Sequence, residues 1–262
     1  MKVKDYFEDV AERGVWGSLY DEDQAVYNYN FLTRRAEVLR LLKGDGAFDR
    51  ILDVGCGTAD YAQVAYEHQS SFHGIDFSPS MIRQARQQLD GQGQHEVLVA
   101  TGENIPYRDN AFDLVMAMGY IEYHRDPTIN LEEIRRVLKP GGVLVIQSFQ
   151  REVPGTISQL IGAPLRFIHR QLLRRGAGPS PLGPEVIVRY SKHQLDSLLK
   201  KFGFVRTDYA FNNFFVYPSR FRSMFPRLSI GLSEKITRSN PKKWGIFAVN
   251  YIGKYTLEKA NL

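Results

Sequence analysis

Three residues in the first third of the chain have types and a spacing suited to binding a nucleoside. Gly55 and Gly57 follow an apolar run in the segment DVGCGT, and Asp76 comes nineteen residues after Gly57. Glycines in such a turn let a ligand approach the backbone closely, because no Cβ is in the way. A carboxylate at the end of the next strand can accept hydrogen bonds from both hydroxyls of a ribose and would repel a 2′-phosphate. We therefore predict a bound nucleoside derivative; the alternative is that Asp76 only caps the helix starting near Pro79.

Apolar periodicity predicts alternating strands and helices around this turn. Strands are expected at residues 50–55, 71–78, 95–100, 111–119, 141–149, 204–212 and 244–254, and helices at 31–42, 59–68, 79–89, 129–138 and 191–204. In the helix at 79–89, the side chains expected to face the core are Met81, Ile82, Ala85 and Leu89. The alternation implies βαβ units, and hence an α/β fold with a doubly wound, mostly parallel seven-stranded sheet.

The overall composition excludes several classes of protein. The chain has 262 residues, of which 43% are hydrophobic and 24% charged, as in a folded globular protein rather than a disordered or fibrous one. Its one cysteine, Cys56, cannot form an internal disulfide, and its six histidines show no metal-ligand spacing, so we expect no metal site. The polar start and the lack of an apolar run near ~20 residues favour a cytoplasmic protein.

Four linked segments resemble, in their order and spacing, the class I S-adenosylmethionine-dependent methyltransferases. They are ILDVGCGTADYAQVA, GIDFSPSMIRQAR, ATGENIPYRDNAFDLVMAMGYIEYHRDP and EEIRRVLKPGGVLVI. The resemblance covers residues from about 31 to 150 and is greatest to the branch that includes ubiquinone/menaquinone-biosynthesis and many small-molecule methyltransferases. It implies a Rossmann-like methyltransferase fold with helical cap insertions, S-adenosyl-L-methionine as the cofactor, and methyl transfer as the activity.

The resemblance also implies roles for individual residues. Gly55 and Gly57 would lie against the methionine part of the cofactor, with Asp53 supporting that loop and the amino group, while Asp76 would hold the ribose. The other cofactor-binding positions that it implies are Cys56 within the glycine motif, Phe77 and Met81 beside the adenine, Gly102 and Glu103 at the adenine edge, and Met118 and Gly119 beside the methyl group. Thr101 stands where the family has an aspartate, so the contact to the adenine amino group would be weaker or supplied by the backbone.

The segment MGYIEYHRD, after the fourth expected strand, supplies the catalytic candidates Tyr120, Glu122 and His124. A base near the acceptor helps when the attacking atom belongs to a hydroxyl, an amine or an acidic carbon. In the family this loop faces the acceptor, but the histidine usually stands where this chain has Tyr123, so an exposed loop histidine is the competing interpretation of His124. Tyr20, in an aromatic N-terminal segment, is expected near the methionine carboxylate, with core packing as the rival reading.

Positive charge is concentrated in two segments of the chain. Residues 152–183 carry a net charge of +3 and residues 219–243 carry +6, although the whole chain carries only +5. Both segments combine arginines with apolar side chains. Such segments can rest on an anionic membrane surface or line a pocket for an acidic, amphiphilic acceptor. The plainer alternative is a cap helix packed on the sheet with a solvated basic face.

We expect a single methyltransferase domain over residues 1–262, with an N-terminal helical lid at 1–43, a cofactor-binding core at 44–150 and cap insertions at 151–184 and 218–243. The expected function is methyl transfer to a small-molecule or lipid-like acceptor, with O-, N- or C-methylation and the oligomeric state left open. An RNA methyltransferase and a non-catalytic S-adenosylmethionine-binding protein are the alternatives, although nucleic acid is not the expected partner. A nicotinamide-dependent oxidoreductase is disfavoured, because Asp60 replaces the third glycine of a dinucleotide fingerprint.

Overall fold

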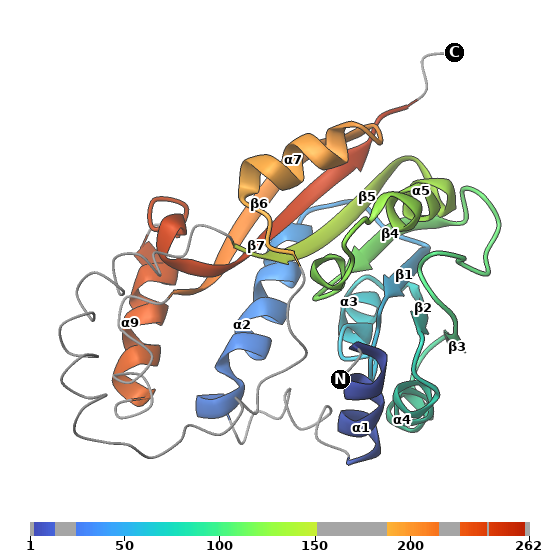
Figure 1. Ribbon diagram of the computed structural model, residues 1–262, viewed down its shortest axis with the longest axis horizontal. Helices are drawn as coiled ribbons and strands as arrows, with labels where there is room; N and C mark the ends of the chain where they lie inside the picture. The colour runs from blue at the N-terminus through green and yellow to red at the C-terminus, as the bar shows by residue number, and fades with distance from the viewer. Residues whose placement is uncertain (1–2, 14–24, 151–187, 215–225, 240, 260–262) are drawn as a thin grey trace.

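One seven-stranded sheet forms the centre of the protein (Figure 1). The structure is a computed structural model, and it describes residues 3–13, 25–150, 188–214, 226–239 and 241–259. The strands are β1 (Arg50–Val54), β2 (Ser71–Asp76), β3 (His95–Val99), β4 (Phe112–Ala117), β5 (Leu138–Phe149), β6 (Phe204–Phe214) and β7 (Ala248–Leu257). Their order across the sheet is β3-β2-β1-β4-β5-β7-β6. Strands β1 to β5 run parallel, and β7 is antiparallel to both β5 and β6. The predicted fold class, with its mostly parallel seven-stranded sheet, is confirmed.

Helices cover both faces of this sheet. They are α1 (Val3–Glu12), α2 (Ala25–Leu42), α3 (Ala62–Glu67), α4 (Pro79–Leu89), α5 (Thr128–Val137), α7 (Lys192–Lys200) and α9 (Pro226–Ser239), with short 3-10 helices η3 (Ile121–Tyr123) and η4 (Gly245–Phe247). Apolar side chains of α5 and α7 join the core on one face, and those of α2, α3 and α4 join the core on the other. The protein is therefore a three-layer α/β structure with two cores separated by the sheet.

Local sequence signals explain why the helices begin where they do. Ser78 is the N-cap of α4, where its hydroxyl accepts a hydrogen bond of 3.0 Å from the backbone N–H of Met81, and Pro79 follows at the first helical position. Helix α7 begins with a capping box formed by Ser191 and Gln194. The four side chains predicted to form the core stripe of α4, Met81, Ile82, Ala85 and Leu89, are all buried.

Two expected elements begin three or four residues later than the sequence suggested. Helix α3 begins at Ala62 rather than at Ala59, because Ala59 has a positive φ of 68° that ends a tight turn instead of starting a helix. The last strand begins at Ala248 rather than at Trp244, since the residues between form the 3-10 helix η4. Of the two predicted cap insertions, residues 151–184 lie outside the described residues, whereas α9 belongs to the second.

The order of the strands places a topological switch point between β1 and β4. From β1 the chain moves outward through β2 to β3, and it then returns to β4 on the other side of β1 before continuing to β5. Crossovers on the two sides of this point leave by opposite faces of the sheet. In open α/β sheets, ligands bind beyond the carboxyl ends of the strands at such a point. The switch point is therefore where a binding site is expected.

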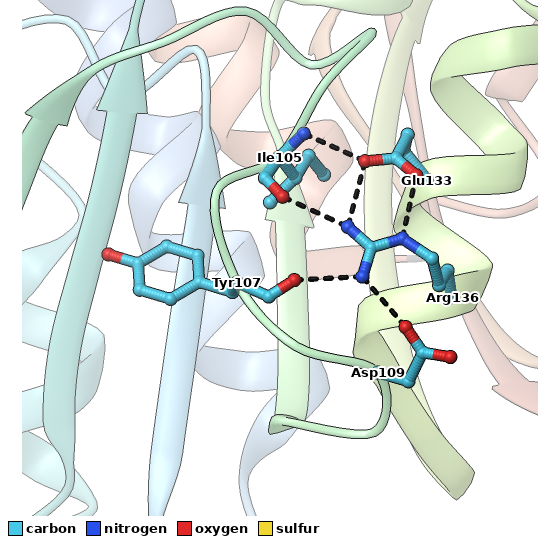
Figure 2. A network of polar contacts seen from close by, with 5 residues as sticks. All are labelled: Ile105, Tyr107, Asp109, Glu133 and Arg136. Carbon is cyan, nitrogen blue, oxygen red and sulfur yellow. Dashed lines mark hydrogen bonds and ion pairs between the residues drawn. The ribbon is translucent and has the colours of Figure 1, made fainter.

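The guanidinium of Arg136 on α5 fixes the loop between β3 and β4 through hydrogen bonds (Figure 2). It donates hydrogen bonds to the carbonyl oxygens of Ile105 at 2.9 Å and Tyr107 at 2.8 Å, and to the carboxylate of Asp109 at 2.8 Å. It also donates twice to Glu133, at 2.7 and 2.9 Å, and Glu133 in turn accepts from the N–H of Ile105 at 2.8 Å. One side chain thus satisfies backbone carbonyls that no strand or helix supplies with partners.

We predict that Arg136→Met lowers the free energy of unfolding by about 2–3 kcal/mol, because it leaves two backbone carbonyls and two carboxylates without their charged donor. Arg135→Met is the matched control, since the side chain of Arg135 on the same helix is exposed, and it should change stability by less than about 0.5 kcal/mol. Urea unfolding followed by circular dichroism measures both variants. Equal stability of the two variants would contradict this account of the loop.

Candidate active site

A cavity of about 310 Å³ lies at the switch point, beside the carboxyl ends of β1, β2 and β4. Nine of the predicted cofactor-binding residues line it: Gly55, Gly57, Asp76, Phe77, Met81, Gly102, Glu103, Met118 and Gly119. The catalytic candidates Tyr120 and His124 line it as well. Asp53, Cys56 and Glu122 are not part of its wall, and Tyr20 lies outside the described residues. Most of the residues selected from the sequence are therefore brought together in one place.

The ring of Tyr120 occupies the space that two glycines leave free. A Cβ built on Gly55 would lie 2.9 Å from Cδ2 of Tyr120, and one built on Gly102 would overlap the Tyr120 hydroxyl. Gly55 also has a φ of 76°, which disfavours any side chain. The Tyr120 hydroxyl donates a hydrogen bond to Oδ1 of Asn130 on α5. Both glycines are therefore required by a tyrosine of the protein itself, as well as by any ligand that lies against the turn.

Asp76, at the end of β2, joins the glycine turn to the start of α4. Its Oδ2 accepts from the N–H of Gly57 at 3.0 Å, and its Oδ1 accepts from the N–H of Ser78 at 2.9 Å. Burial raises the pKa of Asp76 to about 6, and the charge of Glu8 adds to this, although the two backbone N–H groups oppose it. The N-cap of α4 is Ser78, so capping that helix is not the role of Asp76. Each carboxylate oxygen keeps a further lone pair for a ligand hydroxyl.

Asp53 lies beneath the glycine turn, near the end of β1. Its side chain is buried, and within the described part of the chain neither carboxylate oxygen has a hydrogen-bond partner. Burial raises the pKa of Asp53 to about 8, helped by the charges of Asp76 and Asp60 and opposed by that of Arg34. At neutral pH this carboxyl therefore holds a proton until a cation approaches it.

The side chain of Cys56, a residue of the predicted cofactor motif, packs in the core. The thiol is buried against β2, where a Cβ on Gly74 would lie 2.8 Å from Sγ of Cys56 and 3.2 Å from a methyl of Val97. Burial raises the pKa of the Cys56 thiol well above its usual range. Cys56 is therefore a small core side chain that is poorly suited to act as a nucleophile, and a cofactor contact through its backbone stays a prediction.

Helix α1 supplies a wall residue that the sequence analysis missed. Phe7 lines the cavity, and its ring makes edge contacts with Phe77 at 6.2 Å and Tyr123 at 5.4 Å between centroids. The helix is held on α4 by Glu8, which accepts hydrogen bonds from the hydroxyls of Ser78 and of Ser80, the latter at 2.6 Å. The amphipathic pattern VKDYFEDVAE indicates a helix with one apolar face, which could have pointed to Phe7. The lid contact expected from the sequence is instead at Tyr20.

The catalytic candidates occupy different positions. The ring of His124 packs 4.7 Å from that of Tyr120, its Nδ1 lies 4.0 Å from a carboxylate oxygen of Glu103, and burial lowers its pKa. His124 is thus a wall residue on the side of Gly102, rather than an exposed loop histidine. Glu122 is fully buried behind the wall, and burial raises its pKa to about 7 despite the charges of Arg34 and Arg189.

A buried polar cluster lies directly behind Gly119, at the end of β4. Nη1 of Arg34 on α2 donates to Oε1 of Gln147 on β5 at 2.8 Å, and Nε2 of Gln147 donates to Oδ1 of Asn250 on β7 at 3.3 Å. A Cβ on Gly119 would lie 3.2 Å from Nη1 of Arg34 and 3.9 Å from Oε1 of Glu122. The sequence offered no signal for this cluster, because its members come from four distant elements.

The described residues contain neither a candidate metal site nor a candidate membrane-spanning helix. Among the described residues, no group of histidine, cysteine, aspartate and glutamate side chains is arranged to hold a metal ion. Within the same residues, no helix is both long and apolar enough to cross a bilayer.

The glycine turn, the carboxylate at the end of β2 and the cavity at the switch point together define a nucleoside-binding α/β enzyme. Residues 52–146 match the family described as Methyltransferase domain. The demethylmenaquinone methyltransferase of Listeria welshimeri is 30% identical over 174 residues, which span 64% of this chain and 70% of that protein. Its counterpart in Deinococcus radiodurans is 34% identical over 172 residues, which span 61% and 69% of the two chains.

Solved structures show the same fold. The magnesium protoporphyrin IX methyltransferase of Synechocystis, solved with bound S-adenosylhomocysteine, superimposes with a TM-score of 0.62 at 13% identity and covers 97% of each chain. An S-adenosylmethionine-dependent methyltransferase of Thermotoga maritima has a TM-score of 0.56 at 18% identity, over 96% of this chain and 100% of that one. The chain belongs to the class I S-adenosylmethionine-dependent methyltransferases, and its cofactor is S-adenosylmethionine.

We predict that Asp53→Asn changes how stability depends on pH in the cofactor-free protein. The folded pKa of about 8 lies above the ordinary value of 3.8, so the native state keeps a proton that the unfolded chain releases between these values. The wild type therefore loses the stability that this proton contributes as pH rises through this window, and the variant lacks that contribution to the pH dependence.

Urea unfolding of both proteins between about pH 5 and pH 8 measures the effect. The free energy of unfolding of the variant, relative to the wild type, should rise by on the order of 3 kcal/mol across the series. For Asp90→Asn, at an exposed position, the free energy of unfolding should depend on pH as it does in the wild type. The same pH dependence in Asp53→Asn and the wild type would show that Asp53 is ionised in the native state.

Proposed function

We propose that this methyltransferase acts on a small aromatic acceptor of the quinone type, in its reduced, hydroxyl-bearing form. Two kinds of observation support the proposal. The relatives that are 30% and 34% identical over the aligned residues are demethylmenaquinone methyltransferases by name. Besides Phe7 and Phe77, which we assign to the adenine below, three further rings line the cavity: those of Tyr120, Tyr123 and His124. This aromatic lining carries the proposal, since rings pack edge-to-face or offset against another planar ring.

The wall residues fit the adenosyl part of the cofactor. We assign the ribose to Asp76, whose oxygens have free lone pairs, and the adenine to the space between Phe77 and Met81, with Phe7 at its edge. The turn at Gly102 and Glu103 would meet the rim of the adenine. Thr101 also lines the cavity, in the place of the family's aspartate.

The buried charges behind the glycine turn fit the methionine part of the cofactor. We assign its ammonium group to the neighbourhood of Asp53, whose oxygens have no hydrogen-bond partner among the described residues, and its carboxylate to the neighbourhood of Arg34. Met118 and Gly119 would then border the methyl group. When bound, S-adenosylmethionine supplies an electrophilic methyl group.

This chain contributes chiefly by holding the two partners together away from water. Apolar and aromatic side chains form most of the cavity wall, and Tyr120 is fixed by its hydrogen bond to Asn130. A rigid, dry site of this kind accelerates a displacement by keeping the reacting atoms at near-attack distance. An electrophilic methyl group needs an electron-rich acceptor, so a hydroquinone suits the site and an oxidised quinone does not.

The division of the chain into lid, core and cap is also a proposal. Helix α1 supports the lid at residues 1–43, because Phe7 closes part of the cavity. Helix α9 packs on α2 and β6, and its Leu228 is 58% exposed, which suits a surface that meets an apolar tail. Peripheral membrane contact through the two basic segments stays a prediction. An RNA acceptor is the alternative, but a cavity of about 310 Å³ lined by rings favours a small molecule.

We predict that Asp76→Ala weakens binding of S-adenosylmethionine at least about 100-fold, since each hydrogen bond from a ribose hydroxyl to a carboxylate contributes roughly 1.5–3 kcal/mol. Isothermal titration calorimetry measures the dissociation constant. The control Asp90→Ala, at an exposed position at the C-terminal end of α4, should bind within about twofold of the wild type. Unchanged affinity in a folded Asp76→Ala protein would remove the ribose assignment.

We predict that the purified protein methylates a demethylated naphthoquinol with an isoprenoid tail when S-adenosylmethionine is added. The product should gain one methyl group by mass spectrometry, with an equal amount of S-adenosylhomocysteine released, and nuclear magnetic resonance distinguishes carbon from oxygen methylation. The same compound kept oxidised should not react. Transfer of label to RNA with none to the naphthoquinol would overturn the proposal in favour of the alternative.

A further inference from the structure

Glu122 in η3 is a buried group that the cofactor assignments leave unexplained. Its side chain is 0% exposed, and neither of its carboxylate oxygens has a hydrogen-bond partner among the described residues. A carboxyl group buried in this way destabilises the protein unless something compensates it. Its backbone is well held, because the carbonyl of Glu122 accepts from the N–H of Val188 at 3.0 Å. The side chain is therefore fixed in place while its oxygens are left available.

Glu122 lies close to the part of the cavity wall that Gly119 forms, although it is not itself part of that wall. A Cβ on Gly119 would lie 3.9 Å from Oε1 of Glu122, 3.7 Å from Oε1 of Gln147 and 3.2 Å from Nη1 of Arg34. Three polar side chains from η3, β5 and α2 thus converge behind Gly119. Gly119 itself lines the cavity, and in our assignment it borders the methyl group.

The charged and titratable groups that face Glu122 come from three sides. Arg34 lies on α2 and Arg189 precedes α7, and both favour the ionised form of Glu122. Tyr123 in η3 and Tyr190 before α7 also interact with it, and the pKa of each tyrosine is raised, mainly by burial and in part by the Glu122 charge. The carboxyl therefore lies between two cations and two phenols that stay neutral.

We propose that Glu122, with Gln147 beside it, forms the polar end of the acceptor site and that Glu122 accepts the proton of the acceptor's hydroxyl. This inference rests on the proposed function, because it needs an acceptor with an acidic hydroxyl. His124 is less suited to this role, since it lies on the side of Gly102 and faces Glu103. Tyr120 is also less suited, because its hydroxyl already donates to Asn130.

The step balances without any further reagent. The O–H bond of the acceptor breaks, its proton moves to a carboxylate oxygen of Glu122, and the electron pair stays on the acceptor. The acceptor then forms a bond to the methyl carbon while the methyl–sulfur bond breaks, and that electron pair remains on sulfur. If a ring carbon takes the methyl group, the proton of that carbon leaves to solvent and the hydroxyl is restored. A carboxyl group whose pKa is about 7 can both take and release a proton at neutral pH.

The experiment measures binding of 1-naphthol, a stable phenolic probe, to the full-length protein saturated with S-adenosylhomocysteine. The wild type should bind the probe about tenfold more tightly at pH 8 than at pH 6, because only ionised Glu122 accepts a charge-assisted hydrogen bond. Glu122→Gln should bind about tenfold more weakly than the wild type at pH 8 and lose this pH dependence. Its affinity for S-adenosylhomocysteine should stay within about twofold of that of the wild type, since Glu122 is not assigned to the cofactor.

The matched control is Glu132→Gln, an exposed position on α5, which should behave as the wild type does. If Glu122→Gln fails to fold, the pH series on the wild type alone decides: affinity that rises with pH supports the proposal, and affinity that stays flat overturns it. Probe binding in Glu122→Gln equal to that of the wild type also overturns it. Because the probe is bound without turnover, this result is independent of whether the naphthoquinol is methylated. Where it is methylated, kcat of Glu122→Gln should fall at least about 100-fold.

Discussion

The carboxylate of Asp76 is the contact on which the rest of the site depends. It joins the N–H of Gly57, in the turn after β1, to the N–H of Ser78, at the start of α4. The ends of two neighbouring strands are thereby held at a fixed spacing, and the cavity opens between them. Helix α1 docks on the same point, because Glu8 accepts from the hydroxyls of Ser78 and Ser80. Asp76 thus organises the turn and the helix start, and Glu8 holds the lid helix beside them.

Arg34 interacts with several carboxyl groups on the other side of the glycine turn. Its charge opposes the raised pKa values of Asp53, Asp60 and Glu122, all of which are mainly caused by burial. The guanidinium is itself buried and donates to Gln147. Even with Arg35 acting on Asp60 and Arg189 acting on Glu122, these cations do not hold all three carboxyl groups ionised at neutral pH. Without a ligand, this part of the site is therefore partly protonated, and it is suited to a ligand that brings both a positive and a negative charge.

The sequence was sufficient for the parts of the structure that depend on local pattern. The strands, the N-cap of α4 at Ser78 and the nine cofactor positions in the cavity wall follow from periodicity, capping chemistry and the linked motifs. Phe7 was missed because its role depends on where α1 docks. Arg34 and Gln147 were missed because they meet only after the chain has folded, 113 residues apart. The packing of the Cys56 side chain against Gly74 could not be predicted, since neither motif nor spacing shows which way that side chain points.

The contact between Gly102 and Tyr120 limits which residues can stand at these two positions. The tyrosine hydroxyl fills the place where any side chain at position 102 would begin, and it continues to Asn130 on α5. A tyrosine at 120 and a side chain larger than hydrogen at 102 therefore exclude each other. A side chain can therefore appear at 102 only after a smaller residue has replaced Tyr120, so variation at the rim is conditional on prior change in the loop after β4.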